Sequence, residues 1–117
     1  MTRTQFEEIV ERAIAAIPEP FARFLDNVEV VVEDAPSREV LRELGLDPRR
    51  DSLFGLYEGL PIEERRDAML ALPDRIVIYY KPLVQTFRTP GRIQREIEET
   101  VRHEIGHAFG LEDDEMD

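Results

Sequence analysis

Hydrophobic side chains recur at helical spacing near the start of the chain. They follow one another at intervals of three or four residues from Phe6 to Ile17, which predicts an amphipathic helix that ends before Pro18. Thr4 and Glu7 have the spacing of a capping box, in which each side chain bonds a free main-chain amide of the first turn. The chain therefore opens with a helix that buries one apolar face.

Short runs of β-branched and aromatic residues in the middle of the chain predict strands. The expected strands are residues 28–34, 52–61 and 75–81. Gly55 interrupts the second run, which is typical of a bulge or a close backbone approach, and Pro82 is expected to end the third before a loop that runs to Thr89. Shorter helical segments are expected at residues 21–27, at residues 36–44 with Gly45 as a left-handed stop, and at residues 61–71.

A second helical pattern covers residues 90–109, with Thr89 as its N-cap and Gly110 as its C-terminal stop. At about 100° per residue, its apolar positions form one stripe. The stripe comprises Ile93, Ile97, Val101, Ile105 and Ala108, and the opposite, solvated face comprises Arg95, Glu99, Arg102 and Gly106. The helix should therefore pack along one side only.

The composition limits the class of protein. With 117 residues the chain fits a single domain, residues 1–117. The net charge of -11 argues against nucleic acid or an anionic membrane as a partner, and the absence of cysteine excludes disulfides and thiolate metal sites. No apolar run approaches the ~20 residues of a membrane span, and the N-terminal segment lacks the apolar stretch of a signal peptide. We expect a soluble, cytoplasmic protein.

The chemistry of the chain concentrates in its last helix. Both histidines of the protein, His103 and His107, lie one turn apart there, with Glu104 between them. The helical projection places Glu104 at the edge of the apolar stripe, where an ionised carboxylate is costly unless a charge or a hydrogen bond compensates it. Two imidazoles one turn apart can converge on one ion, and a dication there accounts for the position of Glu104. The pattern predicts a metal site.

A catalytic zinc ion takes three protein ligands and leaves one position for water. The two histidines supply two nitrogens, and Gly110 can adopt a positive φ that lets the chain turn back. Asp113 is then the first acid with enough slack to reach the ion, with Glu112 and Asp114 as rivals. Two imidazoles and one carboxylate suit zinc.

The series His103-Glu104-x-x-His107-x-x-Gly110-x-x-Asp113 resembles the extended zinc signature of the zincin metallopeptidases, in the form whose third ligand is aspartate. Together with the stretches DNVEVVVEDAP, LFGLYEGLP and LPDRIVIYYKPL, it makes nearly the whole chain similar to the small bacterial zincin-like metallopeptidases, or minimal zincins. The resemblance implies an α+β fold in which a small mixed β-sheet packs against helices, including a C-terminal zinc-binding helix. It also implies one Zn²⁺ ion held by His103, His107 and Asp113, with Glu104 as the catalytic acid/base.

The leading hypothesis is therefore a zinc-dependent peptidase that acts on a peptide or protein substrate. Residues 53–58 are the candidate edge strand for holding that peptide by strand addition, although Gly55 and Gly59 equally suit a turn. Two alternatives remain: a zinc-binding interaction module without catalytic activity, and a hydrolase of non-peptide amides or esters. A three-ligand site with a carboxylate beside it favours an enzyme, since a structural zinc usually has four protein ligands. The three tyrosines are assigned to strand packing rather than to the site: Tyr57, Tyr79 and Tyr80.

Overall fold

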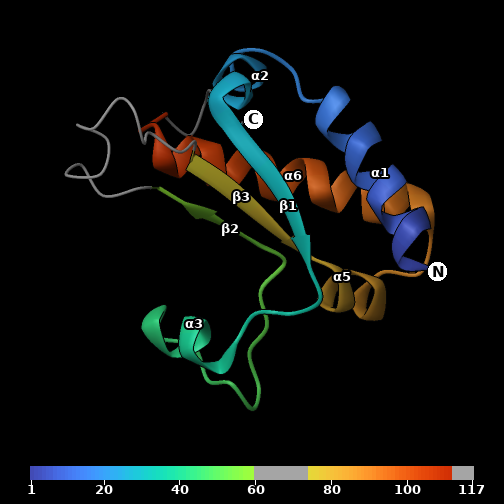
Figure 1. Cartoon of the computed structure of the whole chain (residues 1–117), viewed down its shortest axis with the longest axis vertical. Helices are drawn as coiled ribbons and strands as arrows, with labels where there is room; N and C mark the ends of the chain where they lie inside the picture. Colours follow the sequence, from blue (N-terminus) through green and yellow to red (C-terminus); the bar gives the residue numbers. More distant parts are fainter. Residues whose placement is uncertain (60–73, 112–117) are drawn as a thin grey trace.

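The computed structural model describes residues 1–59 and 74–111, and it has an α+β fold with a three-stranded mixed sheet (Figure 1). The helices in this part of the chain are α1 (Arg3–Ala15), α2 (Phe21–Phe24), α3 (Arg38–Glu43), α5 (Tyr80–Thr86) and α6 (Pro90–Ala108), with a 3-10 turn η1 (Leu25–Asn27). The strands are β1 (Val28–Glu33), β2 (Gly55–Glu58) and β3 (Asp74–Tyr79). The expected fold class is confirmed, and the helix expected at residues 61–71 lies outside the described residues.

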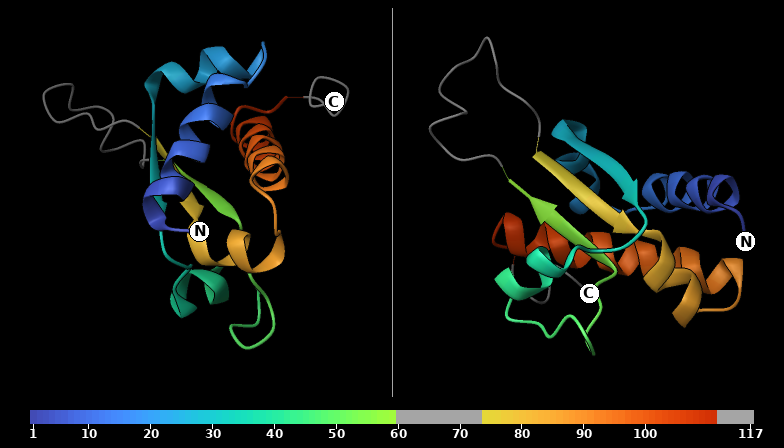
Figure 2. Two further views of the ribbon diagram at one scale, coloured as in Figure 1. Left: turned by 90° about the vertical axis from the view of Figure 1, so that its right-hand side faces the viewer. Right: turned by 60° about the horizontal axis from the view of Figure 1, so that its bottom comes forward.

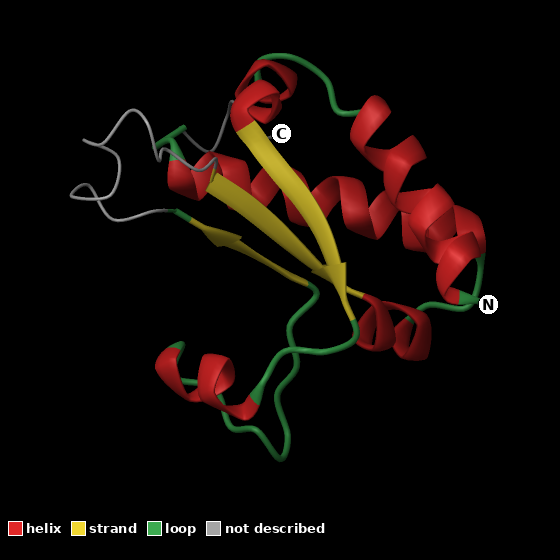
Figure 3. Ribbon diagram, viewed as in Figure 1, coloured by secondary structure: helices red, strands yellow, loops and turns green. Residues whose placement is uncertain are grey.

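The strands of the sheet are ordered β1-β3-β2 (Figure 3). Strand β1 is parallel to β3, with Val30 opposite Ile76, and β2 is antiparallel to β3, with Tyr57 opposite the same isoleucine. Because side chains alternate along a strand, Val30, Ile76 and Tyr57 lie in one row on the same face. The neighbouring row on the other face joins Glu29, Arg75 and Glu58, and the Arg75 Nε donates to Glu58 Oε2 at 2.6 Å.

Helices α1 and α6 lie on the same side of the sheet, and α1 packs against α6 (Figure 2). Strands β2 and β3 also pack on α6. The core combines side chains from α1, α5, α6 and β3, and its fully buried members include Phe6, Ile76, Ile78, Leu83, Ile97, Val101 and Ile105. Four of the five residues predicted for the apolar stripe of α6 are buried. Among the described residues, no helix is both long enough and apolar enough to span a membrane.

The prediction for α6 was wrong at two positions, Gly106 and Ala108. Gly106 is buried although the projection placed it on the solvated face, and Ala108 is exposed although it was assigned to the stripe. Helix α2 also packs against α6, and Phe24 stacks on Phe109 at 4.5 Å between ring centroids, so a second side of α6 is covered. Periodicity within one helix cannot show that another element covers a second side.

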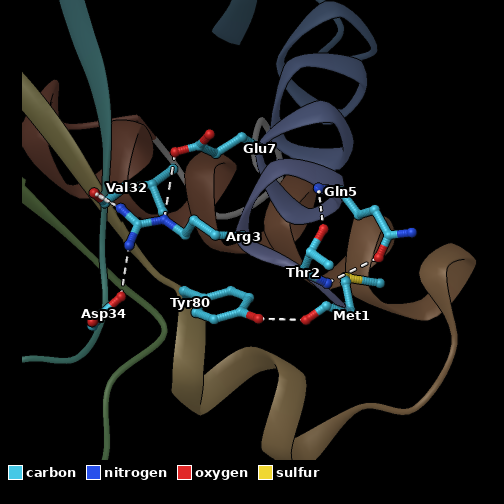
Figure 4. Close-up of polar contacts among 8 residues, drawn as sticks. All are labelled: Met1, Thr2, Arg3, Gln5, Glu7, Val32, Asp34 and Tyr80. Carbon is cyan, nitrogen blue, oxygen red and sulfur yellow. Dashed lines mark hydrogen bonds and ion pairs between the residues drawn. The ribbon is translucent and has the colours of Figure 1, made fainter.

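Helix α1 begins two residues earlier than the sequence suggested. The stretch TRTQFE contains two overlapping capping boxes, and the structure uses the first: the Thr2 hydroxyl accepts from the Gln5 amide at 3.1 Å, and Gln5 Oε1 accepts from the Thr2 amide at 2.9 Å. This start brings Arg3 against the end of β1, where its guanidinium donates to Val32 O at 2.7 Å and to Asp34 Oδ1 at 2.6 Å (Figure 4). With the helix starting at the first cap, Arg3 makes these tertiary contacts with the end of β1.

Two predictions about the strands also need correction. Gly55 does not interrupt a longer strand but is the first residue of β2. Pro82 does not open a loop to Thr89, since the chain passes from β3 directly into helix α5. Pro82 lies in the first turn of α5, where its missing N–H would have no partner within the helix.

Candidate metal centre

The last two turns of α6 carry the predicted metal-binding side chains. The helix starts where the sequence indicated, with the Thr89 hydroxyl accepting from the Arg92 amide at 3.2 Å. The buried stripe fixes the rotation of α6 about its axis, so the side that carries His103 and His107 faces solvent. Their ring centroids lie 6.3 Å apart and their planes differ by 50°. The two imidazoles thus share one exposed side of the helix, as predicted.

This pair fits a zinc ion in spacing and chemistry. In a tetrahedral site with Zn–N bonds of about 2.0–2.1 Å, two imidazole centres lie ~5 Å apart, which is close to the separation of this pair. His103 Nε2 lies 3.7 Å from Glu99 Oε1 on the preceding turn. Within residues 1–59 and 74–111, no group of three or more His, Asp or Glu side chains is placed to hold a metal ion. Asp113 and its rivals Glu112 and Asp114 lie outside the described residues. The structure therefore brings together two of the three expected ligands.

Helix α6 ends in a left-handed turn at Gly110, as the sequence predicted. Gly110 has φ 66°, and the Leu111 amide donates to the carbonyl of Gly106 at 2.9 Å. This bond is the long-range bond of a Schellman motif, in which a residue with positive φ follows the last helical carbonyls. The chain thus leaves the helix axis within one turn of His107.

Glu104 has a partner that the sequence did not reveal. Its side chain is partly buried, and Oε1 accepts a hydrogen bond from the main-chain amide of Tyr57 at 2.8 Å. This bond offsets part of the cost of a carboxylate at the edge of the core. From the sequence, a metal ion alone was expected to compensate that cost. No residue pattern signals such a contact, because every residue except proline carries the same amide.

The Tyr57 amide lies on the edge of the sheet that no further strand covers within residues 1–59 and 74–111. The Tyr79 amide donates to Phe54 O at 2.9 Å, so Phe54 is a hydrogen-bonded position of the β2–β3 ladder. Positions alternate in an antiparallel pair, which makes Gly55 and Tyr57 the non-hydrogen-bonded positions. Their N–H and C=O groups point away from β3, and the Tyr57 N–H meets Glu104 there. Strand β2 is thus an edge strand among the described residues, in agreement with the expectation for residues 53–58.

Gly55 allows β2 to approach α6 closely. A Cβ atom at this position would lie 2.8 Å from Cγ2 of Thr100 on α6 and 3.0 Å from the carbonyl oxygen of Val77 on β3. Both distances are below normal van der Waals contact. The close backbone approach inferred from this glycine is confirmed, and its partner is the helix itself.

The Tyr57 side chain fixes β2 to its surroundings at two further points. Its hydroxyl donates to Asp74 Oδ2 on β3, and its ring contacts Phe109 edge-on at a centroid distance of 5.9 Å. Since Phe109 caps the end of α6, Tyr57 joins the edge strand to the helix segment that carries the histidines.

The other two tyrosines lie away from this edge. Tyr79 is buried on the face of the sheet opposite Ile78, and burial, followed by the negative charges of Glu33 and Glu58, raises the pKa of its hydroxyl. The Tyr80 hydroxyl donates to the carbonyl oxygen of Met1 at the N-terminus (Figure 4). Both serve packing, although Tyr80 belongs to α5 rather than to a strand.

Comparison with known protein families gives a match over most of the chain. The pattern that describes zincin-like metallopeptidases matches residues 25–117, a stretch that begins within η1 and contains all three strands, α6 and the paired histidines. No curated protein matches the chain. The chain therefore belongs to the family of zincin-like metallopeptidases.

Proposed function

We propose that this protein is a zinc-dependent peptidase in which His103, His107 and Asp113 hold one Zn²⁺ ion and Glu104 is the general base and acid. Membership of the metallopeptidase family supports the reaction class. The observation that supports the residue roles is the position of Glu104, which reaches the open edge of β2 while its two histidine neighbours share the exposed side of the same helix.

A bound zinc ion would supply Lewis acidity, which acidifies water and polarises the carbonyl of a peptide bond. The chain supplies the proton transfer. Glu104 accepts a proton from the attacking water and donates it to the leaving amine, so its carboxylate has to lie beside both groups. Glu104 directly follows His103 on helix α6, and this position keeps its carboxylate close to both groups for any substrate.

The edge of β2 favours a peptide over a non-peptide amide or ester. Gly55 and Tyr57 direct their main-chain N–H and C=O groups away from β3, and an extended peptide can pair with such groups by strand addition. A small ester has no repeating backbone to match this pattern. The net charge of -11 further favours cationic peptides, and salt should weaken their attraction.

The first prediction concerns the two roles at the helix. His103→Ala should lose stoichiometric zinc, whereas Glu104→Gln should keep zinc and lower kcat/KM for peptide cleavage by about 10²–10⁴-fold. Metal content by mass spectrometry and cleavage of a mixed peptide library measure the two effects separately. Glu98→Gln is the matched control, because it makes the same chemical change on α6 at a residue whose carboxylate accepts from Gln94.

Each other outcome points to a different function. Stoichiometric zinc without Glu104-dependent cleavage of any peptide would indicate the zinc-binding interaction module. Cleavage of esters but not peptides would indicate the non-peptide hydrolase. Full activity in Glu104→Gln would refute the role of this carboxylate.

A further inference from the structure

We propose that the Tyr57 amide holds the Glu104 carboxylate in the free protein, and that an extended peptide pairing with β2 takes this amide and so releases Glu104. The observation is the 2.8 Å hydrogen bond from the Tyr57 N–H to Glu104 Oε1. The inference rests on the proposed function for the catalytic role of Glu104. It adds a step in which substrate docking and release of the base are one exchange of hydrogen-bond partners.

The geometry of the edge makes the exchange necessary. A peptide that adds to β2 pairs with the outward-facing groups of Gly55 and Tyr57, which lie two residues apart on the same edge. Glu104 already accepts from the second of these amides. A peptide carbonyl and the Glu104 carboxylate therefore compete for one donor.

The donor is held more firmly than the acceptor. Tyr57 is fixed by its pairing with β3, by its hydroxyl bond to Asp74 and by its ring contact with Phe109. Gly55, two residues earlier, already lies so close to α6 that a Cβ there would overlap Thr100. The Glu104 side chain, in contrast, has three rotatable bonds between the helix and its carboxylate. Glu104 moves when the bond breaks, and β2 keeps its position.

The exchange has a measurable effect on peptide affinity. A hydrogen bond to a carboxylate is roughly twice as strong as one to a neutral carbonyl, so the peptide replaces a stronger bond with a weaker one. Removal of Glu104 removes this competitor for the Tyr57 amide. Loss of this acidic residue should therefore strengthen the binding of a peptide strand, which is opposite to the effect of losing a residue that contacts the peptide directly.

Amide hydrogen exchange of metal-free protein tests the resting contact. The Tyr57 amide should exchange at least ~10-fold faster in Glu104→Ala than in the wild type, with the Gly55 amide on the same strand as the internal reference. Glu104→Gln should retain part of the protection, because its side-chain carbonyl still accepts a hydrogen bond. Glu98→Ala, which removes a carboxylate from α6 away from Tyr57, should leave the rate unchanged.

Peptide binding to the same metal-free proteins tests the release. The probe is a blocked hexapeptide of alternating valine and lysine, which favours an extended chain and complements the acidic protein. Glu104→Ala should bind it about 3–10-fold more tightly than the wild type, whereas Glu98→Ala should bind it no more tightly. Bound peptide should also restore the protection of the Tyr57 amide in Glu104→Ala.

Three results would overturn the inference: an unchanged Tyr57 exchange rate in Glu104→Ala, equal or weaker peptide binding by that variant, or no binding of the peptide to either protein. A protein that cleaves peptides in a Glu104-dependent manner but gives one of these results refutes only the exchange. A protein that passes both tests but neither binds zinc nor cleaves refutes only the proposed function.

Discussion

At the scale of single residues, identical amino acids have different roles because their surroundings differ. Gly55 and Gly91 are both glycines without a positive φ. A Cβ on Gly55 would overlap a side chain of α6 and a carbonyl of β3, whereas nothing lies within 4 Å of a Cβ on Gly91. The sequence indicated that Gly55 is unusual, but only the packing shows what approaches it.

Gly55→Ala should lower the free energy of unfolding by about 1–3 kcal/mol, because β2 has to move off α6 to accommodate the methyl group. Gly91→Ala is the matched control and should be neutral or stabilising by up to ~1 kcal/mol. Urea unfolding followed by circular dichroism measures both. Adding Thr100→Ser to Gly55→Ala removes Cγ2, the nearest atom, and should recover part of the loss. Equal stability of the two alanine variants would contradict the packing role.

At the scale of elements, helix α6 was predictable almost completely from the sequence. Its cap at Thr89, its buried stripe and its left-handed end at Gly110 all follow from local signals, because capping and periodicity involve residues within one or two turns. Helix α5 was not predicted, since Pro82 has the same identity whether it stops a strand or lies in the first turn of a helix. The tertiary path of the chain after β3 decides between these two outcomes.

The end of α6 gives a prediction about the third ligand. Gly110→Ala places a side chain at φ 66°, which costs roughly 1–2 kcal/mol. The metal-free chain can relax this strain, whereas a chain that turns back to bind the ion cannot. Zinc affinity, measured by competition with a chelator, should therefore fall by about 5–30-fold. Gly45→Ala carries similar strain at φ 77° after α3 and should leave zinc affinity unchanged. The same affinity in both variants would argue against a ligand beyond Gly110.

At the scale of the whole molecule, the core extends beyond the region that defines the family. The family match begins at residue 25, yet α1 lies before it and contributes Phe6, Ile9, Val10 and Ala13 to the core against α6. Helix α6 thus has its buried stripe covered by the sheet and by a helix that the family pattern does not include. The scaffold of the site depends on both.

Phe6→Ala should therefore destabilise the protein by about 3–5 kcal/mol, although Phe6 lies far from the histidines in the sequence. Glu11→Ala, an exposed change on the same helix, should stay within about 0.5 kcal/mol of the wild type. Thermal unfolding of metal-free protein provides the comparison. A small effect of Phe6→Ala would show that α1 is an accessory rather than part of the core.

The sequence by itself determined the side-chain chemistry and the local elements: the paired histidines with Glu104, the helix that carries them, most of the strands and the family. These features are encoded in residue identity and short-range spacing. Only the tertiary structure decided which faces of α6 are covered, which cap starts α1, and that the Tyr57 amide, 47 residues away in the chain, meets Glu104. Every residue except proline carries the same main-chain amide, so the residue type does not reveal its partner. The packing of the edge strand on the helix determines that partner.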